Sequence, residues 1–154
     1  MKKLLAGSCI IALALAGGCT KSSSTTATAS GGSGGQPKGS TADIDKHGEE
    51  IMASPTKAEA REWMKQPKHV FFKEDPKVVA QFVEEFYQAG AVQVFIGDVE
   101  DHDGTQYGGS LLVVLPKDSA ARAKVFQVEE RACTQFQDDP VSDQGQKYLM
   151  NSFD

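Results

Sequence analysis

One short segment concentrates side chains that could bind a cation. From Asp98 to Asp103 the chain reads Asp-Val-Glu-Asp-His-Asp, which supplies five potential oxygen or nitrogen ligands. Hard cations such as calcium prefer carboxylate oxygens, but a calcium loop needs ligands at alternate positions, a central Gly and a closing Glu at its twelfth position. The segment lacks that spacing, so we interpret it as a solvated acidic hairpin tip and keep cation binding as the alternative.

The other residue types that carry chemistry are scattered along the chain. His47, His69, His102 and Cys133 occur singly, whereas a zinc site needs three or four converging ligands. Nucleophilic catalysis would need a Ser or Cys close to a His and an orienting acid, usually on a motif such as a nucleophile elbow. We find no such motif, and we expect neither enzymatic activity, nor a metal, nor a cofactor.

Hydrophobic periodicity and helix caps predict a single α+β domain over residues 43–154. The expected elements, in chain order, are a short helix between Ser54 and Pro67, a strand from His69 to Lys73, a helix from Asp75 to Gly90, strands from Val92 to Val99 and from Ser110 to Leu115, a helix from Asp118 to about Phe136, and a strand within Gln146 to Phe153.

The order strand, helix, strand, strand, helix, strand, preceded by an extra N-terminal helix, resembles the ferredoxin-like (βαββαβ) arrangement over residues 68–154. This resemblance implies an antiparallel sheet with strand order 4-1-3-2 and both long helices on one face. It implies no particular function, because that fold supports many unrelated activities.

Strand alternation divides the apolar residues of the sheet between two faces. The residues expected to face the helices are Val92, Val94, Ile96, Leu111, Val113 and Leu115. The opposite face, here named the open sheet face, is expected to carry Phe71, Phe95, Leu112 and Val114. Such a face needs a cover. Either the helix that carries Trp63 and Met64 folds back over it, or a homodimer or partner protein docks there, which makes these residues a candidate interaction surface.

The N-terminus has the features of an export signal over residues 1–18. Lys2 and Lys3 precede an apolar run from Leu4 to Ala16, which is too short to remain as a membrane-spanning helix. The run continues into a segment that resembles the lipobox of bacterial lipoproteins, with the residues Leu15, Ala16, Gly17, Gly18 and Cys19.

The lipobox resemblance implies cleavage before Cys19 and lipidation of that residue, which would anchor the protein in the cell envelope. Because Thr20 rather than Asp follows the Cys, the resemblance implies the outer membrane, on its periplasmic side or at the surface. The alternative is a soluble secreted protein, since the segment from Ala14 to Ala16 also forms a small-x-small cleavage site.

Residues 19–42 are expected to form a disordered linker, because from Thr20 onward they are mostly Ser, Thr, Gly and Ala. Removal of Lys2 and Lys3 with the signal leaves 14 basic against 21 acidic residues, a mature formal charge of −7. An acidic domain is a poor binder of nucleic acid. Cys133 is then the one cysteine of the domain, and we expect it to be buried and inert.

Together these patterns predict a membrane-tethered lipoprotein, a non-enzymatic protein-interaction module of the cell envelope. Its partner would be another envelope protein or a second copy of the chain. A small-ligand or cation-binding domain is the alternative function.

Overall fold

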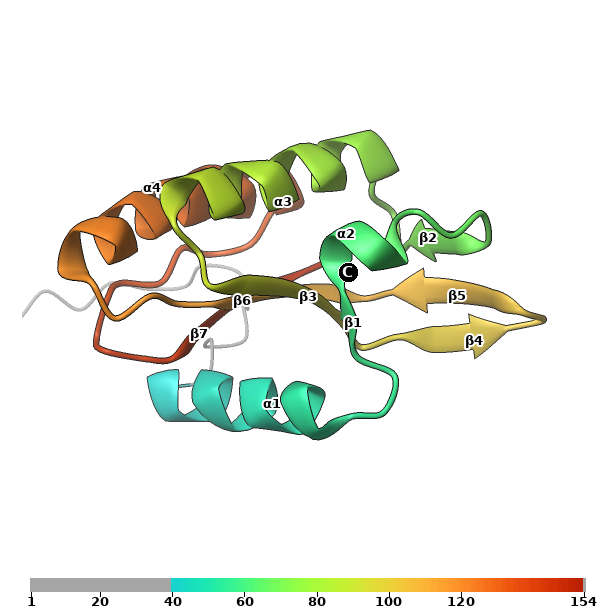
Figure 1. The fold of residues 1–154 in the computed structure, drawn as a ribbon, viewed down its shortest axis with the longest axis horizontal. Helices are drawn as coiled ribbons and strands as arrows, with labels where there is room; N and C mark the ends of the chain where they lie inside the picture. The colour runs from blue at the N-terminus through green and yellow to red at the C-terminus, as the bar shows by residue number, and fades with distance from the viewer. Residues whose placement is uncertain (1–39, 154) are drawn as a thin grey trace, which may run out of the picture. The chain divides into compact units, whose positions relative to one another are not determined.

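The computed structural model describes residues 40–153, and its central feature is a four-stranded antiparallel sheet (Figure 1). The strands in spatial order are β1 (Ala58–Glu59), β3 (Gln93–Gly97), β6 (Ser110–Val114) and β7 (Tyr148–Ser152). The predicted hairpin of β3 and β6 is confirmed, with Phe95 opposite Leu112. The predicted last strand is β7, which places Met150 beside Leu112.

Helices cover both faces of this sheet (Figure 1). The helices α3 (Pro76–Ala89) and α4 (Ser119–Phe136) lie together on one face, as predicted. Helix α1 (Thr41–Ala53) lies against the opposite face. Each of the two faces therefore has its own hydrophobic core.

The two long helices begin where their capping residues predict. The Asp75 carboxylate accepts a hydrogen bond from the Lys77 amide at 2.8 Å, and Asp118 accepts one from the Ala121 amide at 2.8 Å. These side chains satisfy amides that have no partner within the helix. Gly90 ends α3 with a left-handed φ of 106°, which a residue without a Cβ adopts readily.

A second, three-stranded sheet extends from the end of β3 and was not predicted. It consists of β2 (His69–Phe71), β5 (Thr105–Gly108) and β4 (Glu100–His102), in that order. The segment interpreted as an acidic hairpin tip therefore forms a hairpin of its own. Its tip, Asp103-Gly104, has positive φ values of 54° and 76°, the conformation of the turns that suit two-residue hairpins.

The sheet order is only loosely compatible with a ferredoxin-like fold, which is not confirmed. The segment predicted as the first strand of the main sheet is β2, which pairs in parallel with β5 in the second sheet. Strand β7 then pairs directly with β6. Gly108 allows the close packing behind β2, because a Cβ there would lie 2.6 Å from Ile96 Cγ2 and 3.2 Å from the Trp63 ring.

The N-terminal helix differs from the prediction. The segment expected to form a helix between Ser54 and Pro67 contains strand β1 and a helix of only four residues, α2 (Ala60–Trp63). The longer helix α1 comes before it and takes in residues 41 and 42, which were assigned to the linker. Ser40 and Asp43 form a capping box at its start, which stabilises a helix beginning at this point.

The main core lies between the sheet and the helices α3 and α4. It contains five of the six sheet residues predicted to face the helices, namely Val94, Ile96, Leu111, Val113 and Leu115. Val92 is the exception, with 57% of its surface exposed just before β3 begins. The alternation therefore gave the correct faces within the strands.

Candidate functional site

The open sheet face is covered by α1. Ile51 of this helix packs with Phe95, Leu112 and Tyr148 in a second hydrophobic cluster, and all four are buried. Gly48 brings the helix close, since a Cβ there would lie 2.5 Å from Cδ2 of the Tyr148 ring. The cover that this face needs is thus supplied within the chain.

The structure brings together three of the four residues predicted to form the interaction surface. Phe95 and Leu112 are buried beneath α1, and Val114 is half-buried against the same cluster. Phe71 instead lies in the main core, with its ring centroid 5.0 Å from that of Trp63. Of the two covers considered for the open face, neither the Trp63 helix nor a partner is the one found: Trp63 lies in the main core on the other side of the sheet, and α1 covers the open face.

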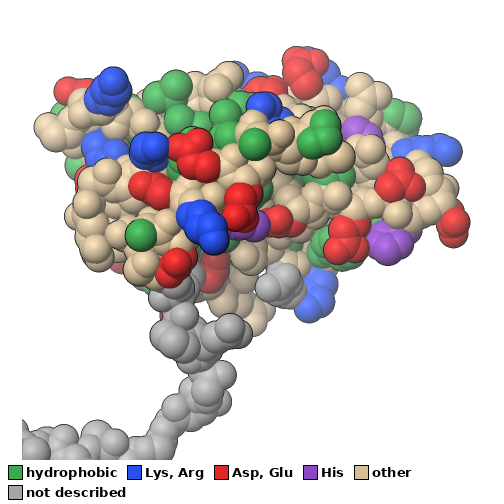
Figure 2. Space-filling view, turned by 90° about the horizontal axis from the view of Figure 1, so that it is seen from below, with side chains coloured by type: hydrophobic (Ala, Val, Ile, Leu, Met, Phe, Trp, Pro, Cys, Tyr) green, Lys and Arg blue, Asp and Glu red, His purple; other side chains and the backbone are tan. Residues whose placement is uncertain are grey.

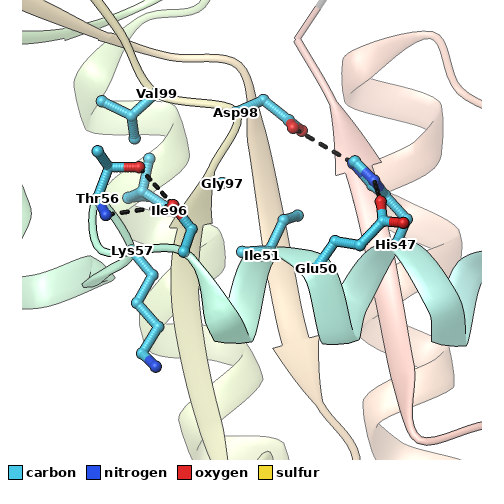
Figure 3. A pocket seen from close by; sticks show the side chains of 10 residues that line it. His47, Glu50, Ile51, Thr56, Lys57, Ile96, Gly97, Asp98 and Val99 are labelled. Atoms are coloured by element: carbon cyan, nitrogen blue, oxygen red, sulfur yellow. Dashed lines mark hydrogen bonds and ion pairs between the residues drawn. The ribbon is translucent and has the colours of Figure 1, made fainter.

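A pocket lies beside α1, at the end of β3 where the chain continues beyond its pairing with β1 (Figure 3). Its volume is about 240 Å³. Pockets for drug-sized ligands hold roughly 300–1,000 Å³, so this one suits a side chain or a small ion better. The pocket is lined by His47, Glu50, Ile51, Ser54, Thr56, Lys57, Ile96, Gly97, Asp98 and Val99.

A histidine between two carboxylates forms one end of the pocket (Figure 3). His47 Nε2 lies 3.3 Å from Asp98 Oδ1, and His47 Nδ1 lies 3.3 Å from Glu50 Oε2. The buried Ser110 hydroxyl donates a hydrogen bond to Asp98 Oδ2 at 2.6 Å. These contacts join α1 to the segment that follows β3.

The other end of the pocket is formed by the connection between α1 and β1. The hydroxyls of Ser54 and Thr56 are hydrogen-bonded to each other at 2.7 Å. Lys57 donates from Nζ to the carbonyl of Met52, and its side chain points away from Asp98 (Figure 3). The Lys57 charge therefore lies at the end of α1 and not at Asp98.

The acidic segment singled out in the sequence leads from this pocket to the exposed hairpin of β4 and β5. Glu100, Asp101 and Asp103 are all exposed, and His102 contacts Glu100 at 3.0 Å. Figure 2 looks onto the α1 side and shows acidic side chains at the hairpin end on the right and over α1, with some basic ones among them. The pocket and hairpin thus share a predominantly acidic surface.

The same segment does not form a cage for a cation. Within residues 40–153, no group of three or more His, Cys, Asp or Glu side chains is placed to hold a metal ion. The Asp101 carboxylate instead accepts a hydrogen bond from the Gly104 amide at 3.1 Å, which stabilises the hairpin turn. Asp101 thus acts on the backbone of the turn, and the exposed carboxylates of Glu100 and Asp103 add to the surface charge.

The hydroxyls around the pocket are hydrogen-bonded to partners other than the His47 imidazole. Ser110 is buried and donates to Asp98, so its oxygen is directed at a carboxylate and not at the imidazole. Ser54 and Thr56 bond to each other at the opposite end. Besides these hydroxyls, the pocket lining offers charged and apolar side chains.

Cys133 is buried, as predicted, but it lies in a polar group that the sequence did not reveal. Its thiol donates to Glu129 Oε1 at 3.2 Å, and the Asn151 amide donates to the thiol at 3.4 Å. All three side chains are buried between α4 and β7. Burial of polar groups is tolerated where they bond to one another, which gives this group a structural role.

The three α1 residues of the pocket, His47, Glu50 and Ile51, were missed because α1 was not predicted. The signals that could have found the helix are its capping residues at 40 and 43 and the helical spacing of Ile44, Ile51 and Met52. The predicted lipidation site at position 19 lies outside the described residues. Among residues 40–153, no helix is long and apolar enough to span a membrane.

Comparisons with known proteins give no family to which the chain can be assigned: no family model matches it, and neither a curated protein nor a solved structure matches it.

Proposed function

We propose that the protein is a non-enzymatic interaction module of the cell envelope, anchored through a lipid on Cys19, and that its partner contacts the pocket and the acidic hairpin. The observation that carries this proposal is the pocket beside α1, which combines an apolar wall with two carboxylates at the base of an exposed hairpin. The burial of the open sheet face beneath α1 supports this choice of surface, because Phe95 and Leu112 are covered there.

The charge of the two elements also favours a protein contact here. Helix α1 and the segment 98–103 together carry eight acidic side chains and a single Lys. Complementary charge speeds up association and selects against partners of the wrong sign. A cation-binding function has less support, since the acidic residues surround no common point.

A ferredoxin-like origin of the domain also stays a proposal. Two helices on one face of an antiparallel sheet support it, whereas the order β1-β3-β6-β7 argues against it. It adds nothing to the functional proposal, because the fold alone does not specify an activity.

Site-specific photo-crosslinking in intact cells tests the proposed contact. A benzophenone amino acid in place of His102, at the exposed hairpin, should give a discrete adduct with one envelope protein. The same group in place of Glu130, an exposed position on α4, is the matched control. Adducts that are identical from both positions, or absent at position 102, would reject the hairpin as the contact.

A further inference from the structure

We propose that the pocket between α1 and the end of β3 receives a basic side chain, arginine or lysine, that a partner protein presents. This inference rests on the proposed function and adds the chemistry of the partner. The structure carries it in three ways: an apolar wall, an Asp98 carboxylate with no Lys or Arg of the described residues within ion-pair distance, and an acidic surface around the opening.

The apolar wall suits the long stem of a basic side chain. Ile51 and Ile96 line the pocket and are buried, and Val99 is half-buried beside them (Figure 3). Lys and Arg side chains pack their methylene groups against such surfaces while the charged group stays in polar surroundings. The volume of about 240 Å³ is on the scale of one side chain.

The acidic end has room for more hydrogen bonds than it now accepts. Asp98 accepts from Ser110 on one oxygen and lies near His47 on the other. An ionised carboxylate offers about four acceptor sites on its two oxygens. Within residues 40–153, no Lys or Arg lies within ion-pair distance of Asp98, and Glu50 meets only the exposed Lys46, at 4.0 Å. A guanidinium or ammonium group would supply the missing donors.

The surroundings favour a protein over a small free amine as the source of this group. The exposed carboxylates of Glu100, Asp101 and Asp103 lie beyond the pocket on the hairpin, so a small amine that fills the pocket would not contact them. A partner that inserts one basic side chain would also bring further surface against the hairpin. Contacts of that kind add to affinity and determine orientation.

Titration with a matched set of probes tests the inference by NMR. The protein is the mature chain from residue 19 with Cys19→Ser, labelled with ¹⁵N. The probe is a blocked pentapeptide of glycines with a central arginine. Two controls are the same peptide with citrulline, which is neutral and nearly the same shape, and methylguanidine, which is a free cation.

We expect the arginine peptide to shift the amide signals of Gly97 and Asp98 in a saturable manner, with a dissociation constant on the order of 1 mM. The citrulline peptide should bind at least about tenfold more weakly, since charge-assisted hydrogen bonds are the stronger ones. Equal binding of the two peptides would overturn the inference. Methylguanidine binding as tightly as the arginine peptide would overturn the choice of a protein as the source.

Two variants then locate the site. Asp98→Asn and Glu50→Gln should each weaken binding of the arginine peptide by about tenfold. Asp98 also accepts a hydrogen bond from the buried Ser110, whereas Glu50 is exposed. We therefore expect Glu50→Gln to fold like the parent. Glu130→Gln, on the other side of the sheet, is the matched control and should bind like the parent. Unchanged binding in both pocket variants would overturn the inference.

Failure of this inference is distinguishable from failure of the proposed function. If the hairpin crosslinks to a discrete envelope protein but the arginine peptide does not bind, the module function stands and the basic side chain is wrong. If the peptide shifts no signal and the hairpin also gives no adduct, the proposed function fails as well.

Discussion

Helix α1 is expected to be an integral part of the domain, and Ile51→Ala tests this most directly. Ile51 is 5% exposed and packs with Phe95, Leu112 and Tyr148. Truncation of a buried Ile to Ala costs about 2–5 kcal/mol, part of which is the cavity left behind. Because Ile51 also lines the pocket, relaxation around the site is easier, and we expect the lower part of this range.

The matched control is Lys46→Ala on the same helix. The Lys46 side chain is 78% exposed, so this variant should change the free energy of unfolding by about 0.5 kcal/mol or less. In Ile51→Ala, the change to Ala also raises the helix propensity slightly, by a few tenths of a kcal/mol. This gain is too small to mask the loss of packing.

Urea unfolding of the mature chain measures both variants. Trp63 is a suitable fluorescence probe, because it lies in the main core and reports on unfolding of the whole domain rather than on α1 alone. If Ile51→Ala were no more destabilising than Lys46→Ala, α1 would not be the cover of the sheet, and the pocket would lose one of its walls.

Three further outcomes follow from individual contacts. Gly108→Ala should destabilise by about 1–3 kcal/mol in urea unfolding, since its Cβ would lie 2.6 Å from Ile96. Hydrogen bonds from Arg122 hold the pKa of Asp143 below its usual range, so this carboxyl stabilises the fold above its unfolded pKa. The stability advantage of the parent over Asp143→Asn should therefore shrink as the pH falls through the folded pKa in acid titrations followed by circular dichroism. Intact mass of the mature protein should show an acylated Cys19, and an unmodified N-terminus at position 17 would contradict the anchor.

The local elements of the fold could be predicted because their signals lie within a few residues. The β3–β6 hairpin followed from alternating apolar residues, and the long helices followed from Asp75 and Asp118 as caps. Helix α1 was missed because it follows directly on a Ser, Thr and Gly segment and has few large apolar residues, chiefly Ile44 and Ile51. Its stability comes from the sheet beneath it, which its own sequence does not reveal.

The pairing of β2 and the composition of the pocket could not be predicted for a related reason. A three-residue strand has too few side chains to specify its neighbour, and β2 lies where Gly108 leaves room for Trp63 and Phe71, which are distant in the sequence. The pocket joins His47 to Asp98, two residues from segments far apart in the chain. The acidic segment was recognised as a candidate, but the sequence could not show that a helix assigned in part to the linker completes the site.

The edges of the main sheet give a further reason to look for the partner at the hairpin end. An edge strand can recruit a partner by strand addition when its outward amides are free. On β7, the Asp45 carboxylate accepts from the Tyr148 amide at 3.3 Å, and Asp138 accepts from the Ser152 amide at 3.4 Å. The opposite edge, β1, is only two residues long. With one face beneath α1, the other beneath α3 and α4, and both edges short or capped, the main sheet offers a partner little surface, which supports the proposal that the partner contacts the pocket and its acidic hairpin.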